Sequence, residues 1–157
     1  MKLILASSSP RRAELLRNAG ISFSVLTSAI DETPVPGELP NDLVLRLANA
    51  KAELVAARAV GPAIVIAADT AVLIDGEILG KPRTTDDARQ MLNRLSGHVH
   101  SVVTGVTEDL CAARRGGSED EFGGGHVAAR ILHARLGNSL CMWPDARLLG
   151  VPDPSTD

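Results

Sequence analysis

Two adjacent arginines, Arg11 and Arg12, stand where a helix is expected to begin, directly after a serine-rich turn, SSSP at residues 7–10. The unpaired N–H groups of a first helical turn already carry partial positive charge, so each arginine there costs roughly 0.3 to 1 kcal/mol. A bound phosphate reverses that sign, because it accepts charge-assisted hydrogen bonds from guanidinium groups, hydroxyls and free N–H groups. The stretch therefore predicts a phosphate site. The alternative is an ordinary capped helix whose arginines reach into solvent.

Other charged residues lie close to predicted element ends. Asp69 follows an apolar run and is placed for catalysis or metal binding, or else serves as a turn former beside Thr70. Lys81, in the sequence GKP, offers a point charge to a phosphate. Asp31 and Glu32 open a loop and either supply a magnesium ligand or are simply solvated. Together with Arg11, Arg12 and Lys51, this inventory suits a magnesium-assisted attack on a nucleoside triphosphate.

Two histidines, His98 and His100, point the same way on a predicted strand and raise the question of zinc. A zinc site needs three or four protein ligands, and no third candidate is placed nearby. We therefore expect no zinc at this position.

Composition narrows the class of protein. The 157 residues are 45% hydrophobic and carry a net charge of −3, so they offer no general attraction to nucleic acid or to an anionic membrane. Aromatic residues make up only 2%, which argues against a base-stacking surface. Cys111 and Cys141 form no CxxC pair, and the N-terminal apolar run is four residues long. We expect a cytoplasmic protein whose partners are small molecules.

The elements that must hold these residues follow from periodicity, caps and breakers. Ser9 is a good N-cap with Pro10 at the first helical position, and Gly20 is a natural stop. Strands and helices are expected to alternate in this order: strand 3–6, helix 10–19, strand 21–28, helix 42–60, strand 63–68 ending at Asp69, a hairpin around Asp75 and Gly76, a helix capped by Thr84 or Thr85 and closed by Gly97, and strand 98–107. Alternation of this kind predicts an α/β sheet covered by helices.

After residue 107 the sequence changes character. It becomes rich in glycine, arginine and alanine, without an alternating run typical of a strand, and offers at best one helix at residues 126–136.

Seven ordered blocks then identify a resemblance. They are LASSSPRRAELL (5–16), DET (31–33), RLANAKA (46–52), IAADTAV (66–72), GEILGKP (76–82), MLNRLSGHVH (91–100) and SVVTGV (101–106). In that order they resemble the Maf family of nucleoside triphosphate pyrophosphatases. The resemblance covers residues 3–107 and implies an elongated mixed sheet flanked by helices, like that of inosine triphosphatases, and often a homodimer. It also implies cleavage of a nucleoside triphosphate to the monophosphate and pyrophosphate with a divalent metal, Mg²⁺ or Mn²⁺.

The resemblance also assigns roles, position by position. It implies that the phosphates are held by Ser7, Arg11, Arg12, Lys51 and Lys81. Glu32 and Asp69 would bind the metal, and Asp69 would activate the attacking water. The pattern SPRR with ADT is similar to the branch acting on dTTP and UTP, so Arg11 and Thr70 would govern specificity.

The family pattern is not continued beyond residue 107. The block GEPxDKAGxYxIQG and the final VVGLP-type strand of the family are absent, so the C-terminal part of the fold is expected to be missing or replaced. We divide the chain into a catalytic region, 1–107, and a divergent tail, 108–157, with the hypothesis that the tail is a wrong-frame translation or an unrelated segment. The alternative function is an impaired protein that binds nucleotide or phosphate without cleaving it.

Overall fold

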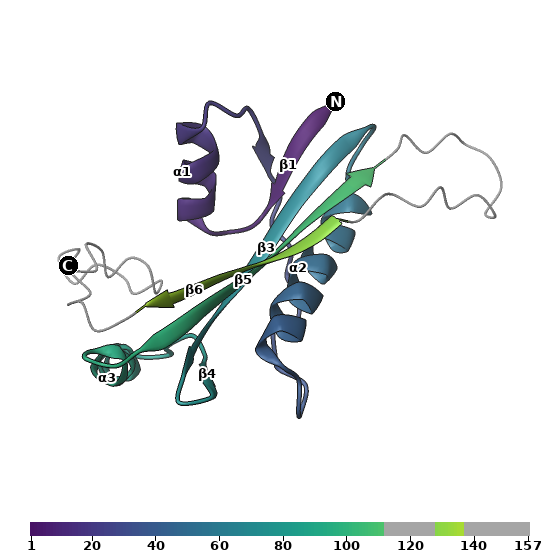
Figure 1. Cartoon of the computed structure of the whole chain (residues 1–157). Coiled ribbons are helices and arrows are strands. Elements are labelled where there is room, and N and C mark those ends of the chain that lie inside the picture. The colour runs from purple at the N-terminus through teal and green to yellow at the C-terminus, as the bar shows by residue number, and fades with distance from the viewer. Residues whose placement is uncertain (112–127, 137–157) are drawn as a thin grey trace. The chain divides into compact units, whose positions relative to one another are not determined.

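The computed structural model describes residues 1–111 and 128–136, which form both helices and strands (Figure 1). In order they are β1 (Lys2–Ala6), α1 (Pro10–Asn18), β2 (Ser24–Val25), α2 (Pro40–Ala56), β3 (Ala63–Ile74), β4 (Glu77–Leu79), α3 (Thr85–Leu95), β5 (His100–Cys111) and β6 (Ala128–Leu136). The strands form one sheet in the order β2-β1-β3-β5-β6, with β4 paired to β3. The predicted α/β class is confirmed.

The chain forms two compact units. Among the described residues, one unit comprises 1–70, 104–111 and 128–132, and the other comprises 71–103 and 133–136. The long strands β3 and β5 run from one unit into the other. The predicted division at residue 107 falls inside β5, and the tail that it defines lies mostly outside the described residues, so that division stays a prediction.

The core of the first unit lies between α2 and the paired strands β1 and β3. These strands are parallel, with Leu3 opposite Ile64 and Ala6 opposite Ala67. Parallel strands that are covered on both faces have continuous apolar sequences, and the consecutive residues Ile4, Leu5 and Ala6 are all buried here. The central cluster consists of Ile4, Ala6, Ala52, Val55, Ala63, Val65 and Ala67. Burial of these side chains stabilises the position of α2 against the sheet.

Strand β3 changes partner along its length. Its first half pairs in parallel with β1 as far as Ala67, and its second half pairs antiparallel with β4 from Val72 to Ile74. The expectation that the strand ends at Asp69 is therefore wrong, because the hairpin that follows keeps the backbone extended. Asp69 nevertheless lies just beyond the parallel ladder, where β1 has already ended at Ala6.

Helix α2 approaches β5 closely at Gly105. A Cβ atom there would lie 2.7 Å from the carbonyl carbon and oxygen of Val44 and 2.9 Å from the backbone nitrogen of Leu45. Nearby, the fully buried Thr107 donates a hydrogen bond from Oγ1 to Asn49 Oδ1 at 2.6 Å. A glycine in a strand interior often marks such a close approach. The contact fixes how near α2 lies to the sheet.

Several local signals are confirmed in the second unit. Thr84 caps α3 in a reciprocal capping box with Asp87. The hairpin between β3 and β4 turns at Asp75 and Gly76, with φ angles of 52° and 80°, as a two-residue turn of primed type requires. These features depend only on neighbouring residues, so the sequence alone indicates them.

Other expectations need correction. The predicted strand 21–28 is reduced to two residues, Ser24 and Val25, which pair with the edge of β1. Residues 128–136 form strand β6 beside β5 and not part of a helix, because pairing with a distant strand overrides the local helical preference. On α1, Ala13 is buried, whereas Leu15 is 63% exposed.

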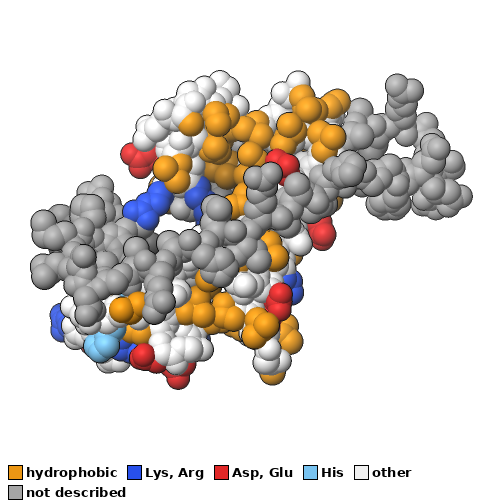
Figure 2. Space-filling view, in the orientation of Figure 1, with side chains coloured by type: hydrophobic (Ala, Val, Ile, Leu, Met, Phe, Trp, Pro, Cys, Tyr) orange, Lys and Arg blue, Asp and Glu red, His pale blue; other side chains and the backbone are white. Residues whose placement is uncertain are grey.

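The surface carries apolar side chains as well as charges. Figure 2 shows hydrophobic side chains over much of the face drawn, and Leu39 and Val60 are among the large exposed ones. Within the described ranges, no helix is long and apolar enough to cross a membrane.

Candidate active site

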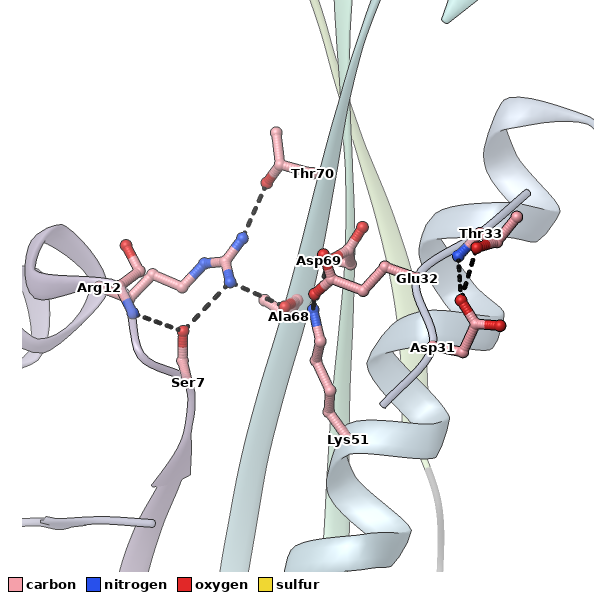
Figure 3. A network of polar contacts seen from close by, with 10 residues as sticks. Ser7, Arg12, Asp31, Glu32, Thr33, Lys51, Ala68, Asp69 and Thr70 are labelled. Atoms are coloured by element: carbon pink, nitrogen blue, oxygen red, sulfur yellow. Dashed lines mark hydrogen bonds and ion pairs between the residues drawn. The ribbon is translucent and has the colours of Figure 1, made fainter. Parts of the chain in front are cut away.

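Arg12 lies on the first turn of α1 and joins three backbone segments. Its Nη1 atom donates to Ser7 Oγ at 3.2 Å and to the carbonyl oxygen of Ala68 at 2.8 Å, and its Nη2 atom donates to Thr70 Oγ1 at 3.0 Å (Figure 3). The alternative in which this arginine reaches into solvent is therefore wrong. The partners are all neutral oxygen atoms, so the guanidinium charge has no direct counter-ion among them.

The electrostatic setting of Arg12 is mixed. Burial lowers the pKa of its guanidinium, while the nearby carboxylates of Asp69 and Glu32 act in the opposite direction. An arginine keeps its proton in either case. The site thus holds a fixed, partly desolvated positive charge at the beginning of a helix.

Ser7 is buried and holds the turn before α1. Its Oγ atom accepts from the backbone N–H of Ser9 at 3.2 Å as well as from Arg12. Ser9 is the N-cap residue, as predicted, but its own side chain makes no capping hydrogen bond. The hydroxyl of Ser7 therefore organises the turn. Arg11, in contrast, is exposed.

Lys51 is buried in α2 and bridges two carboxylates. Its Nζ atom lies 2.6 Å from Asp69 Oδ1 and 2.7 Å from Glu32 Oε1 (Figure 3). The side chains of Lys51 and Asp69 are only 10% and 15% exposed. Three predicted site residues from a loop, a helix and a strand thus converge, and two carboxylate oxygens face one cation.

A second ion pair holds the loop that carries Glu32. Arg46, on α2, donates from Nε to Glu38 Oε1 at 2.6 Å, from Nη2 to Glu38 Oε2 at 2.8 Å and from Nη2 to the carbonyl oxygen of Thr33 at 3.2 Å. The hydrogen bonds from Arg46, with one from the backbone N–H of Val35, lower the pKa of Glu38 to about 2. The loop is therefore tied to the same helix that carries Lys51.

Asp31, which the sequence offers as a magnesium ligand beside Glu32, is engaged within its own loop. Its Oδ1 atom accepts from the backbone N–H of Thr33 at 2.9 Å and from Thr33 Oγ1 at 2.6 Å, and these bonds lower the pKa of Asp31. Figure 3 shows its carboxylate apart from the three groups around Lys51. Asp31 shapes the loop, whereas Glu32 reaches the ion pair.

Thr70 extends the polar network to β5. Its hydroxyl lies 3.0 Å from Thr104 Oγ1, in addition to accepting from Arg12. Sequence reasoning missed Thr104, Arg46 and Glu38. Thr104 and Arg46 stand inside the recognised blocks at 101–106 and 46–52, but no spacing rule connects either of them to its distant partner.

The remaining candidates lie in the second unit. Lys81 is exposed and follows β4 by two residues. His100 is buried and His98 is exposed, and the described part of the chain holds no group of three His, Cys, Asp or Glu side chains around one point.

The two carboxylates at Lys51 suit a hard cation such as Mg²⁺ or Mn²⁺, which takes few protein ligands and completes its shell with water and phosphate oxygens. In this structure the Lys51 ammonium lies between these two oxygen atoms.

Comparison with known proteins gives a family match and relatives that share one name. Residues 2–124 match the family described as Maf-like protein. A dTTP/UTP pyrophosphatase of Anaeromyxobacter dehalogenans (strain 2CP-C) is 46% identical over 142 residues, which are 90% of this chain and 69% of that protein. A dTTP/UTP pyrophosphatase of Geotalea uraniireducens (strain Rf4) is 55% identical over 103 residues, 66% of this chain and 53% of that protein.

Solved structures with a similar arrangement are more distant. One is a nucleoside-triphosphatase, dITP/XTP pyrophosphatase, of Mycobacterium abscessus, with 14% identity and a TM-score of 0.43 over 86% of this chain and 71% of the other. The Ham1 protein of Staphylococcus aureus has 14% identity and a TM-score of 0.45, over 88% of this chain and 73% of the other.

Proposed function

Because the chain belongs to the Maf-like protein family, as the seven sequence blocks indicated, we propose that it hydrolyses nucleoside triphosphates to the monophosphate and pyrophosphate. The names of the relatives make dTTP and UTP the first substrates to test. The observation that carries the proposal is the convergence of Glu32 and Asp69 on one cation, Lys51. A second cation, Arg12, is hydrogen-bonded to Ala68 and Thr70, the residues on either side of Asp69 in the sequence.

In this proposal the triphosphate is bound by cationic and hydroxyl groups. Arg12, Arg11 and Ser7 gather at the beginning of α1, where helix N–H groups also favour an anion. Lys51 contributes its ammonium, and Lys81 is included on the sequence resemblance alone. Thr70, which already contacts Arg12, and Arg11 are proposed to govern which base is accepted.

Cleavage requires a water molecule to attack the α-phosphorus while the bond from that phosphorus to the bridging oxygen breaks. We assign Asp69 as the carboxylate that accepts the proton of this water, because strand β3 places it beside Glu32 and Lys51 just beyond the parallel ladder. Glu32 and Asp69 would hold Mg²⁺ or Mn²⁺, which when bound neutralises charge that develops on the phosphate oxygens. The products are the nucleoside monophosphate and pyrophosphate.

Pyrophosphate release from dTTP, UTP and CTP, measured with Mg²⁺ or Mn²⁺, tests the proposal. The Asp69→Asn variant should lose activity by about a hundredfold or more, in the range expected for removal of a general base. Asp75→Asn makes the same chemical change at an exposed turn with positive φ, which asparagine tolerates, and should leave turnover unchanged. Removal of the divalent ion with a chelator should abolish turnover.

Absence of turnover from the folded wild-type chain would contradict the proposal. If such a chain were still stabilised by nucleotide, the alternative of a protein that binds without cleaving would replace it. The proposal extends to a cytoplasmic setting, expected from the cysteine pattern and the short N-terminal apolar run, and to a homodimer, implied by the sequence resemblance. Size-exclusion chromatography with light scattering tests the homodimer.

A further inference from the structure

The position of Lys51 raises a question about how a metal reaches its carboxylates. The ammonium group contacts Asp69 Oδ1 at 2.6 Å and Glu32 Oε1 at 2.7 Å, so it occupies the point at which both oxygen atoms converge. A divalent ion that is bound by the same two oxygens requires that point. The lysine and the ion therefore compete for one place.

Charge balance points in the same direction. The carboxylates of Glu32 and Asp69 and the cations of Lys51 and Arg12 have formal charges that cancel, and the two carboxylates also act on Arg12 electrostatically. A free divalent ion thus approaches a neutral group of side chains. If it entered while Lys51 stayed, the ammonium would lie next to two added positive charges.

The side chain of Lys51 is the more adaptable of the two cations. A lysine ends in a compact charge on a flexible four-carbon stem, but the fork of Arg12 is held by three oxygens from separate segments. A displaced ammonium still needs an anion, because the Lys51 side chain is only 10% exposed and a buried unpaired charge is costly.

We propose that Lys51 is the resident counter-cation of Glu32 and Asp69, and that it keeps a divalent metal out until a polyphosphate arrives to receive its ammonium. This inference rests on the proposed function for the identity of the polyphosphate. Its consequence is that metal and nucleotide bind as a coupled pair, and that the metal alone binds weakly.

The test measures the dissociation constant for Mn²⁺ alone, without nucleotide, by electron paramagnetic resonance of the free ion. Lys51→Met removes the ammonium and should tighten Mn²⁺ binding by about tenfold or more, a size typical of coupling between sites. Lys51→Arg keeps the charge and should bind Mn²⁺ as weakly as the wild type. Lys2→Gln removes one positive charge from an exposed position of the same unit and should have no effect.

A second variant covers the case in which Lys51→Met does not fold. Lys51→Gln carries no charge but donates amide hydrogen bonds to the same carboxylates, and it should also tighten Mn²⁺ binding. Equal Mn²⁺ affinity in the wild type and in the folded neutral variant overturns the inference, and so does an Arg variant that binds as tightly as the neutral ones. Because nucleotide is absent, the result is independent of whether the wild-type chain releases pyrophosphate.

Discussion

The region around Arg12 and the region around Lys51 hold their cations in opposite ways. Arg12 donates only to neutral oxygens, those of Ser7, Ala68 and Thr70. Lys51 is paired with two carboxylates. The first arrangement fixes the position of the Arg12 guanidinium without a direct counter-ion, so an anion can bind to it without breaking an ion pair. The second satisfies the charge, so an incoming ligand must rearrange it.

The largest effect is expected from a change that moves helix α2, which carries Lys51. Gly105→Ala places a methyl group 2.7 Å from the backbone of Val44, so α2 has to shift, and we expect a loss of about 3 kcal/mol in unfolding free energy. Urea denaturation measures it. Gly80→Ala is the matched control, because a Cβ there meets nothing within 4 Å. Similar stability of the two variants would show that the helix does not rest on β5 at this glycine.

Removal of the Arg12 guanidinium should have a smaller effect on stability. Arg12→Met leaves two hydroxyls and a carbonyl without their donor, and we expect a loss of about 1 to 2 kcal/mol in unfolding free energy. The same variant should lose most of the thermal stabilisation that nucleotide gives. Arg11→Met, on the exposed neighbour, should change unfolding free energy by less than about 0.5 kcal/mol. Equal losses in the two variants would contradict the distinction between the two arginines.

A subtler change tests whether Thr70 transmits order from β5 to Arg12. Thr104→Val keeps the shape of the side chain and removes the hydroxyl that lies 3.0 Å from Thr70 Oγ1. We expect a cost of about 1 kcal/mol, typical of one hydrogen bond, and Thr104→Ser should retain most of the stability. Thermal unfolding of the two variants measures the difference. If the serine variant is as unstable as the valine variant, the loss of stability comes from packing and not from the hydroxyl.

The smallest effect concerns pH. The hydrogen bonds from Arg46 lower the pKa of Glu38 from 4.5 to about 2 in the folded chain, so the ionised pair stabilises the fold above pH 4.5. That contribution is lost as the pH falls from 4.5 toward 2, because the unfolded state then takes up a proton first. Unfolding followed across this range should show a steeper fall for the wild type than for Glu38→Gln. Parallel curves would remove Glu38 from the account of acid sensitivity.

The sequence predicts the parts of this fold that depend on neighbouring residues. The turn at Ser9 and Pro10, the hairpin at Asp75 and Gly76, and the box at Thr84 all follow from local chemistry. Residues 128–136 were expected to form part of a helix but form strand β6. Composition did not reveal this strand, because its pairing with β5 is a contact between distant segments.

For the candidate site, the sequence indicates which residues matter better than how they are held. Lys51, Glu32 and Asp69 were predicted and are brought together. The bonds of Arg12 to Ala68 and Thr70 span more than fifty positions, and the tie from Arg46 to Glu38 joins a helix to a proline-rich loop. Such contacts form only when the tertiary structure brings distant segments together, so the sequence pattern does not predict them.

The change of partner along β3 has a consequence for the order of folding. The hairpin with β4 closes over a two-residue turn, an event of microseconds, whereas pairing with β1 joins Lys2 to Ala63 across most of the first unit's chain. Long loops close late, because their entropy cost precedes any reward from contacts. Asp69 lies between the early and the late half of the same strand. We therefore expect the site around Asp69 to be completed late in folding, when β3 has paired with β1.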